Sequence, residues 1–325
     1  MSEVKVAFIG AGGNARGHMT RLSEVDDANI VAICDLSEDA AKSATDEFGG
    51  TVYTDHHKML DEVEMDAVYV SIPPFAHTDA EIIAAEAGIH LFVEKPVVTD
   101  MEQGLEILSA IRDAGVLSSV GYQLRLLDTS QRIKAYLAKR TVAMISSHRW
   151  GGLPGVAWWR VMEQSGGQLH EQTTHQVDLM RYLTGHEIVE VYAKYDLLTM
   201  DDVENITIPD SQAAIFTFDN GTIATVTTSP MMTQGGGKSD LNFLLRDQII
   251  GWSTGSVNVS GAEAPELEGE PEDTPNIDET FVRAILAGDQ SIIPCSYEDG
   301  LRTADVTLAA NESAKTGKPV TPQMA

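Results

Sequence analysis

The segment QLHEQTTHQVD, residues 168–178, brings together side chains that can bind metals or transfer protons. His170 and His175 are five residues apart, one more than in the H-E-x-x-H motif of zinc metalloproteases. On a regular helix they would lie about 140° apart, so they could not bind one ion together. Glu171, His175 and Asp178 have helical spacing and would share a face. We predict no metal site here, while proton transfer and a structural Glu–His–Asp network both stay open.

A lysine closes one of the apolar runs in the first third of the chain. Glu94, Lys95 and Pro96 end the run HLFVEKP, residues 90–96. If this run is a strand of an open parallel sheet, its carboxyl end faces the crevice where ligands bind. Lys95 would then present its ammonium group to a substrate. The alternative is an ordinary ion pair between Lys95 and Glu94 at the surface.

The first apolar run, residues 4–10, leads directly into G-A-G-G-N-A, a G-x-G-x-x-A pattern. Gly10 permits the tight turn, Gly12 lets the backbone approach a pyrophosphate, and Ala15 lets the helix pack closely on the strand. The pyrophosphate would sit at the N-terminus of the following helix, where free N–H groups favour anions. We therefore assign the turn to a dinucleotide, with the residues Gly10, Gly12, Gly13, Asn14 and Ala15.

An acidic residue, Asp35, ends the second apolar run, residues 29–35. An acid at this distance from the glycine turn binds the hydroxyls of the adenosine ribose. Its carboxylate would repel a 2′-phosphate, and no arginine follows immediately in DLSED. We predict NAD as the cofactor, with NADP less favoured.

Short apolar runs alternate with helix-like segments in the first third, which predicts a doubly wound parallel sheet. The expected strands are residues 4–10, 29–35, 67–73, 90–96 and 117–123, and the expected helices include 76–88 and 101–115. Gly88 and Gly115 would cap those two helices.

The pattern changes after about residue 125, where β-prone stretches follow one another and predict a mainly antiparallel sheet. These stretches are 142–150, 187–198, 212–220, 221–229 and 241–252, after a helix at 129–140. Asn220-Gly221 between two of them indicates a hairpin. Helices are expected again at 279–288 and 297–317. We predict an α/β protein with a Rossmann domain at 1–123 and a second α/β domain at 124–274.

The composition excludes several classes of function. The 325 residues include 49 acidic and 22 basic ones, a formal net charge of -27 that would repel nucleic acid. Acidic residues concentrate in 263–275, which we interpret as a solvated loop. No apolar run is long enough to span a membrane. The start of the chain lacks a signal-peptide pattern, and Cys34 and Cys295 are far apart, so we expect free thiols and a cytoplasmic location.

The combination of motifs resembles the Gfo/Idh/MocA family of NAD(P)-dependent oxidoreductases, typified by glucose–fructose oxidoreductase and inositol dehydrogenase. The matching segments, in the order of the family, are residues 10–18, 71–77, 93–98, 121–125, 166–185 and 296–320. The resemblance implies a Rossmann domain, a second domain with a large open-faced, mainly antiparallel sheet, and a C-terminal segment, about 275–325, that packs back on the Rossmann domain. It also implies a homodimer or homotetramer formed through that sheet.

The resemblance further implies hydride transfer between NAD(P) and a secondary alcohol or ketone of a sugar, polyol or inositol-like substrate. Lys95 and His175 match the family's lysine and histidine, which handle the proton. Glu171 stands where an aspartate is usual and Thr173 where a glycine is usual, which leaves the role of Glu171 open. Two other functions are compatible: transient NAD redox in glycoside cleavage or epimerisation, and a non-catalytic NAD sensor.

Further site residues follow from their positions beside these motifs. To the cofactor we assign Ser71, Ile72, Pro73, Pro74, His77, Glu94, Lys95, Gln123, Trp159 and Arg160. To the substrate we assign Tyr122, Arg125, Trp158 and Asp178. For the Trp158–Arg160 segment and for His77 a purely structural role is the alternative, and His56 and His57 receive no role.

Overall fold

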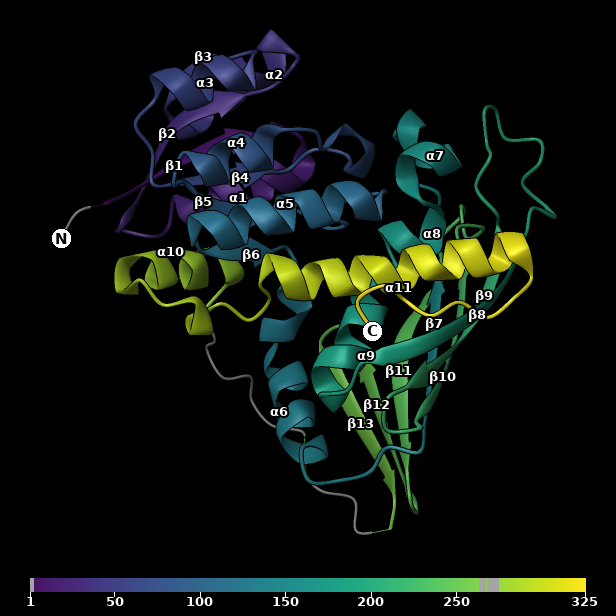
Figure 1. Cartoon of the computed structure of the whole chain (residues 1–325). Helices are drawn as coiled ribbons and strands as arrows, with labels where there is room; N and C mark the ends of the chain where they lie inside the picture. The colour runs from purple at the N-terminus through teal and green to yellow at the C-terminus, as the bar shows by residue number, and fades with distance from the viewer. Residues whose placement is uncertain (1–2, 263–266, 268–274) are drawn as a thin grey trace. The chain divides into compact units, whose positions relative to one another are not determined.

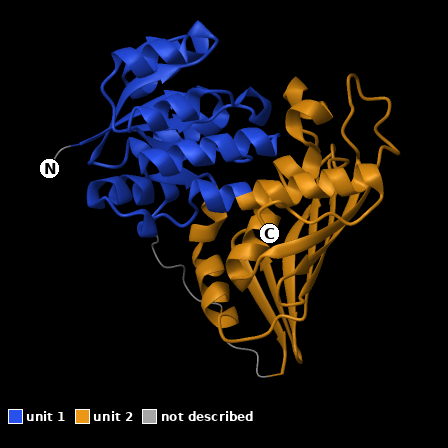
Figure 2. Ribbon diagram, in the orientation of Figure 1, with its two compact units in different colours: residues 1–121, 275–301 blue, residues 122–274, 302–325 orange. Residues whose placement is uncertain are grey.

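The computed structural model describes residues 3–262, 267 and 275–325 (Figure 1). The chain divides into two compact units, shown in Figure 2. Unit 1 comprises residues 1–121 and 275–301, and unit 2 comprises residues 122–274 and 302–325. The predicted boundary after residue 123 lies two residues from the observed one. The C-terminal segment is divided: residues 302–325 cluster with unit 2, not with the Rossmann unit as expected.

Unit 1 contains a six-stranded sheet in which every pair of strands is parallel, in the order β3-β2-β1-β4-β5-β6. Its strands are β1 Val4–Ile9, β2 Ala28–Cys34, β3 Thr51–Tyr53, β4 Ala67–Val70, β5 His90–Val93 and β6 Ser118–Val120. This strand order is that of the doubly wound dinucleotide-binding fold. Successive strands are added outward from β1 on one side and from β4 on the other, so the strand order reverses between β1 and β4. The predicted Rossmann fold is confirmed.

Among the residues that the structure describes, five helices connect these strands, and a sixth, α10, comes from the C-terminal part of the chain. They are α1 Gly13–Leu22, α2 Glu38–Phe48, α3 His56–Glu62, α4 Ala80–Glu86, α5 Met101–Ala114 and α10 Ile277–Ala287. Ser37, Asp55 and Asp100 each accept a hydrogen bond from a backbone N–H at a helix start. Gly115 ends α5 in the left-handed conformation, as predicted. The sequence did not indicate β3, because this three-residue edge strand has no apolar run.

Unit 2 contains a seven-stranded sheet in the order β13-β12-β11-β7-β10-β9-β8. Its strands are β7 Met144–Trp150, β8 Ile188–Asp196, β9 Ser211–Phe218, β10 Ile223–Ser229, β11 Lys238–Leu245, β12 Gln248–Ser253 and β13 Ser256–Gly261. Only β7 and β10 pair in parallel, and every other pair is antiparallel. The predicted mainly antiparallel sheet is therefore confirmed.

Two details of this sheet differ from the sequence prediction. The stretch 241–252 is two strands, not one, because the chain turns at Asp247, whose φ is 60°. Strand β13 was not predicted. The hairpin at Asn220-Gly221 is present: Gly221 has φ 88°, and the Asn220 side chain accepts from the N–H of Thr222. Most of the acidic segment 263–275 lies outside the described residues.

One face of the unit 2 sheet is covered by helices. These are α6 Asp128–Leu137, α9 Thr174–Thr184 and the part of α11 (Tyr297–Thr316) that belongs to unit 2. Apolar side chains of all three pack with the sheet in one core, among them Ile133, Val177 and Val306. Burial of this apolar face supplies the main favourable free energy of folding for the unit.

The same sheet also carries a row of partly exposed apolar side chains. Ile249, Leu244, Met144 and Ile223 lie directly opposite one another on β12, β11, β7 and β10. Their side chains are 44%, 39%, 46% and 44% exposed. Such a contiguous row on neighbouring strands is typical of a surface that is buried in an assembly.

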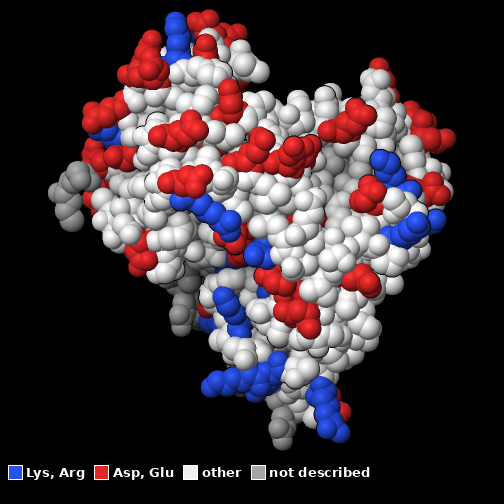
Figure 3. Space-filling view, viewed as in Figure 1, with Lys and Arg blue, Asp and Glu red and all other residues white. Residues whose placement is uncertain are grey.

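The outer surface is otherwise rich in charge. Acidic side chains spread over unit 1 on the face shown in Figure 3.

Within the described residues, no helix is both long enough and apolar enough to cross a membrane. Cys34 and Cys295 are buried and are not joined in a disulfide, and burial raises the pKa of the Cys34 thiol to about 11.

Candidate functional site

The glycine turn between β1 and α1 has the geometry that close backbone approach requires. Gly10 has φ 102°, and a Cβ there would lie 2.1 Å from the carbonyl oxygen of Ser71 on the loop after β4. Gly12 is the N-cap of α1 and makes no side-chain cap bond, and the first turn holds no acidic residue. The backbone N–H groups at this helix start are therefore placed to bind an anion.

Asp35 lies beside that turn. Its carboxylate accepts hydrogen bonds from the N–H groups of Ala11 and Ser37, each at 2.8 Å. The surroundings of Asp35 are acidic, because Glu38 and Asp39 occupy the first turn of α2. The arrangement suits ribose hydroxyls and opposes an additional phosphate.

The loop after β4 begins at the carboxyl edge of the sheet and then turns inward. The N–H of Ser71 donates to the carbonyl of Ile9, and the chain continues through Ile72, Pro73 and the short helix Pro74–Ala76. His77 is buried and pairs with Glu81, which is also buried. His77 therefore points into the interior of unit 1, and its expected cofactor contact stays a prediction.

Lys95 follows β5 at the same edge of the sheet, as the sequence predicted. It is half-buried, and its backbone N–H donates to Oε2 of Glu94 at 3.1 Å. Glu94 is 6% exposed and its other oxygen, Oε1, lies 2.8 Å from Nε2 of His18. Glu94, which we assigned to the cofactor, thus has partners for both oxygens inside the unit.

A buried charged cluster surrounds His18, to which the sequence gave no role. Nδ1 of His18 lies 2.6 Å from Asp278, and Arg21 also pairs with Asp278. Burial alone would lower the pKa of His18, but the hydrogen bonds to Asp278 and Glu94 outweigh it and raise the pKa to about 9. A pKa of about 9 favours the imidazolium form of His18 at neutral pH, and Nη2 of Arg21 also lies 2.9 Å from Nδ1. Asp278 is 260 residues further along the chain, so no local pattern indicates the pair.

The segment 168–178 in unit 2 is not one regular helix, and that premise of the sequence analysis was wrong. Helix α8 spans Gly167–Glu171 and α9 spans Thr174–Thr184, with a break at Gln172 and Thr173. Thr173 donates its N–H to the carbonyl of Gln168, and its hydroxyl bonds that of Thr228 on β10. The calculated separation of the histidines on a helix therefore does not apply.

Each group of this segment has its own surroundings. His170 is fully buried and bonds Thr307. Glu171 accepts a hydrogen bond of 2.6 Å from Nε1 of Trp159. Burial lowers the pKa of Arg149, and the charge of Glu171 opposes that shift. Arg149 was not singled out from the sequence, since nothing local to β7 places it near Glu171.

His175 lies at the start of α9 and is half-buried. Its ring meets the ring of Tyr122 edge-on, with centroids 5.8 Å apart and an angle of 90° between planes. The Tyr122 hydroxyl bonds that of Thr174, 2.7 Å away, and both side chains are buried. Tyr122 thus supports the position of the histidine.

Arg125 and Asp178 form a buried ion pair in unit 2. The Arg125 Nε and Nη2 groups donate to the two oxygens of Asp178 at 2.9 and 2.6 Å, and each residue is 1% exposed. Thr303 donates to the same carboxylate at 3.2 Å. This pairing accounts for both residues as structural groups, and their expected contact with substrate stays a prediction.

The other residues assigned in unit 2 differ in exposure. Trp159 is 1% exposed and is held by Glu171, whereas Trp158 and Arg160 are half-buried and Gln123 is exposed. Nε of Arg160 is buried and has no hydrogen-bond partner among the described residues. The assignment of Arg160 to the cofactor therefore stays a prediction.

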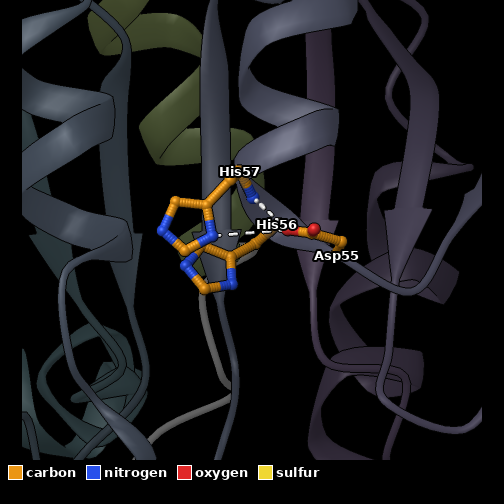
Figure 4. Close-up of side chains that lie close together, drawn as sticks. All are labelled: Asp55, His56 and His57. Atoms are coloured by element: carbon orange, nitrogen blue, oxygen red, sulfur yellow. Dashed lines mark hydrogen bonds and ion pairs between the residues drawn. The ribbon is translucent and has the colours of Figure 1, made fainter.

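Asp55, His56 and His57 gather at the start of α3 and are of metal-binding types (Figure 4). Asp55 caps the helix by accepting from the N–H of His57. Both imidazoles pair with Asp79, at 3.0 and 2.8 Å. These surface ion pairs and the cap account for the cluster without an ion.

Two family models match the sequence. Residues 4–122 match the model described as an oxidoreductase family with an NAD-binding Rossmann fold, and residues 140–249 match the GFO/IDH/MocA C-terminal domain. An uncharacterized oxidoreductase of Bacillus subtilis, YrbE, is 26% identical over 98% of this chain and 96% of its own. Inositol 2-dehydrogenase 2 of Mycolicibacterium vanbaalenii is 28% identical over 98% of this chain and 95% of its own.

A solved structure shows the same fold. The WlbA dehydrogenase of Bordetella pertussis, determined in complex with NADH and UDP-GlcNAcA, has a TM-score of 0.86 to this chain. It is 23% identical, and the match covers 98% of each chain.

The raised pKa of His18 predicts how stability depends on pH. The ordinary pKa of 6.5 applies to the unfolded chain, so the stabilisation by charged His18 is complete below about pH 6.5 and is lost as the pH rises through about 9. We expect the melting temperature of the wild type to fall over this range more steeply than that of His18→Gln, measured by thermal unfolding. A difference between the two proteins that does not change with pH would contradict a charged His18.

Proposed function

Because this chain belongs to the Gfo/Idh/MocA family of NAD-binding oxidoreductases, we propose that it transfers hydride between NAD and a secondary alcohol or ketone of a sugar, polyol or inositol-like substrate. The observation that carries the proposal lies in unit 1. The anion-binding turn at Gly12, the acid Asp35 and the amine-bearing Lys95 all follow strands at the carboxyl edge of one parallel sheet. A binding module without chemistry would have no need of Lys95.

The relatives support this class of substrate. Among the similar proteins are an inositol 2-dehydrogenase and a dehydrogenase whose structure holds NADH and UDP-GlcNAcA. Inositol and the sugar of UDP-GlcNAcA are both ring compounds with secondary hydroxyl groups.

The residues of this chain divide the work as follows. Bound NAD would supply the hydride acceptor. His175 accepts the hydroxyl proton, since a histidine titrates near neutral pH. Lys95 donates a hydrogen bond to the same oxygen and stabilises the negative charge that develops there. Glu171, which accepts a hydrogen bond from the Trp159 indole and interacts with the charge of Arg149, would orient or tune the groups around His175. In ketone reduction each proton moves in the reverse direction.

Substitution of the two proton-handling residues tests the proposal. We expect Lys95→Met and His175→Ala to bind NAD normally and to lose about 10²- to 10⁴-fold in turnover, the usual contribution of such groups. The measurement is NADH formation in a screen of inositols, sugars and sugar acids, with NAD affinity followed by fluorescence. His57→Ala, at an exposed histidine, is the control and should keep full turnover. Near-normal turnover of either site variant would overturn these roles.

For the cofactor we propose NAD over NADP, on the basis of the acidic surroundings of Asp35. Asp35→Asn removes the charge and keeps the size of the side chain. We expect the ratio of kcat/KM for NAD to that for NADP to fall about tenfold, which corresponds to about 1.4 kcal/mol. Asp46→Asn, at an exposed position of α2, removes a charge elsewhere on the same helix and should leave the ratio unchanged. An unchanged ratio in Asp35→Asn would contradict the assignment.

We also propose a homodimer or homotetramer that buries the exposed row of the unit 2 sheet. The row Ile249–Leu244–Met144–Ile223 supplies the apolar contact that such an interface needs. We expect Met144→Glu and Ile223→Glu, made separately, to give monomers in size-exclusion chromatography with light scattering. Each substitution would place an unpaired carboxylate in the apolar interface, which opposes association.

Leu286→Glu, at an apolar residue of α10 that is 43% exposed, is the matched control and should keep the oligomeric state. A wild-type monomer, or sheet variants with the wild-type mass, would overturn the proposed interface.

A further inference from the structure

We infer that His18 is a positioning residue, which holds the Glu94 carboxylate so that the turn carrying Lys95 keeps its place at the edge of the sheet. The inference rests on the role proposed above for Lys95. His18 itself need not touch the substrate or the cofactor. It lies on α1, a helix whose start carries the glycine turn, and its side chain is 3% exposed.

The Glu94 carboxylate has little freedom. Oε1 lies 2.8 Å from Nε2 of His18, and Oε2 accepts the backbone N–H of Lys95 at 3.1 Å. A Cβ on Gly121 would lie 2.5 Å from Oε1, so the carboxylate packs directly against the backbone after β6. The same carboxylate therefore fixes the N–H of Lys95 on one side and depends on His18 on the other.

The opposite side of His18 is anchored just as firmly. Nδ1 lies 2.6 Å from the fully buried carboxylate of Asp278 on α10, and Arg21 bonds the same carboxylate. The imidazolium thus has one carboxylate at each nitrogen. If the link to Glu94 is lost, a buried carboxylate lacks its cation and must rearrange or take up a proton, which disturbs the adjacent Lys95 turn.

A purely structural role is the alternative, and two matched substitutions separate it from positioning. The amide nitrogen of a glutamine can take the place of Nε2, and that of an asparagine the place of Nδ1. His18→Gln therefore keeps a donor for Glu94, whereas His18→Asn keeps a donor for Asp278. Both variants lose the same positive charge, so a difference between them reports which carboxylate matters.

The expected result is a split between turnover and cofactor binding. For His18→Asn we expect kcat to fall about 10- to 100-fold relative to His18→Gln, because a displacement of about 1 Å costs that much. The dissociation constant for NAD, measured by fluorescence, should be equal in the two variants. Equal kcat values, or a loss of NAD affinity in His18→Asn alone, would overturn the inference.

A double-mutant cycle tests whether the effect passes through Lys95. In the Lys95→Met background the difference between His18→Asn and His18→Gln should vanish, because the group that His18 positions is gone. A difference that persists there would show a separate effect and overturn the inference. If Lys95→Met itself keeps normal turnover, the proposed function fails first, so the two failures are distinguishable.

Discussion

Charged groups that are buried must be paired, and this requirement determines how distant segments of the chain are joined. In unit 1 the imidazolium of His18 lies between the carboxylates of Glu94 and Asp278. In unit 2 Arg125 and Asp178 satisfy one another. Removal of one partner from such a pair leaves an uncompensated buried charge, which is far more costly than the loss of a surface ion pair. Each pair thus restricts the relative movement of the elements that carry it.

The parallel sheet of unit 1 brings residues that are far apart in sequence to one edge of the sheet. The glycine turn follows β1, Asp35 follows β2, Ser71 follows β4 and Glu94 follows β5. All four strands end at the same edge, because they run in the same direction. The contact between Gly10 and the Ser71 carbonyl shows how closely adjacent strand ends approach. The cluster around His18 then connects this edge to α10, which comes from the C-terminal part of the chain.

The sheet of unit 2 has a different organisation, with helices on one face and an exposed apolar row on the other. The alternation of buried and exposed residues along β7, β9 and β10 separates the two faces. The break between α8 and α9 likewise separates the groups of one short segment. Glu171 at the end of α8 bonds Trp159, whereas His175 at the start of α9 meets Tyr122. A continuous helix would have directed both side chains to one face.

The sequence alone determined the class of fold, the glycine turn, Asp35 and the position of Lys95, because these depend on local patterns: apolar period, turn residues and strand ends. The family resemblance added His175 and the open-faced sheet. Only the tertiary structure showed three buried contacts: His18 with Asp278, His18 with Glu94, and Arg125 with Asp178. The tertiary structure also showed the break between α8 and α9 at Gln172 and Thr173, where the Thr173 hydroxyl bonds that of Thr228 on β10. Residues that meet across long sequence separations leave no local signal, and their partners are decided by how the sheets and helices pack.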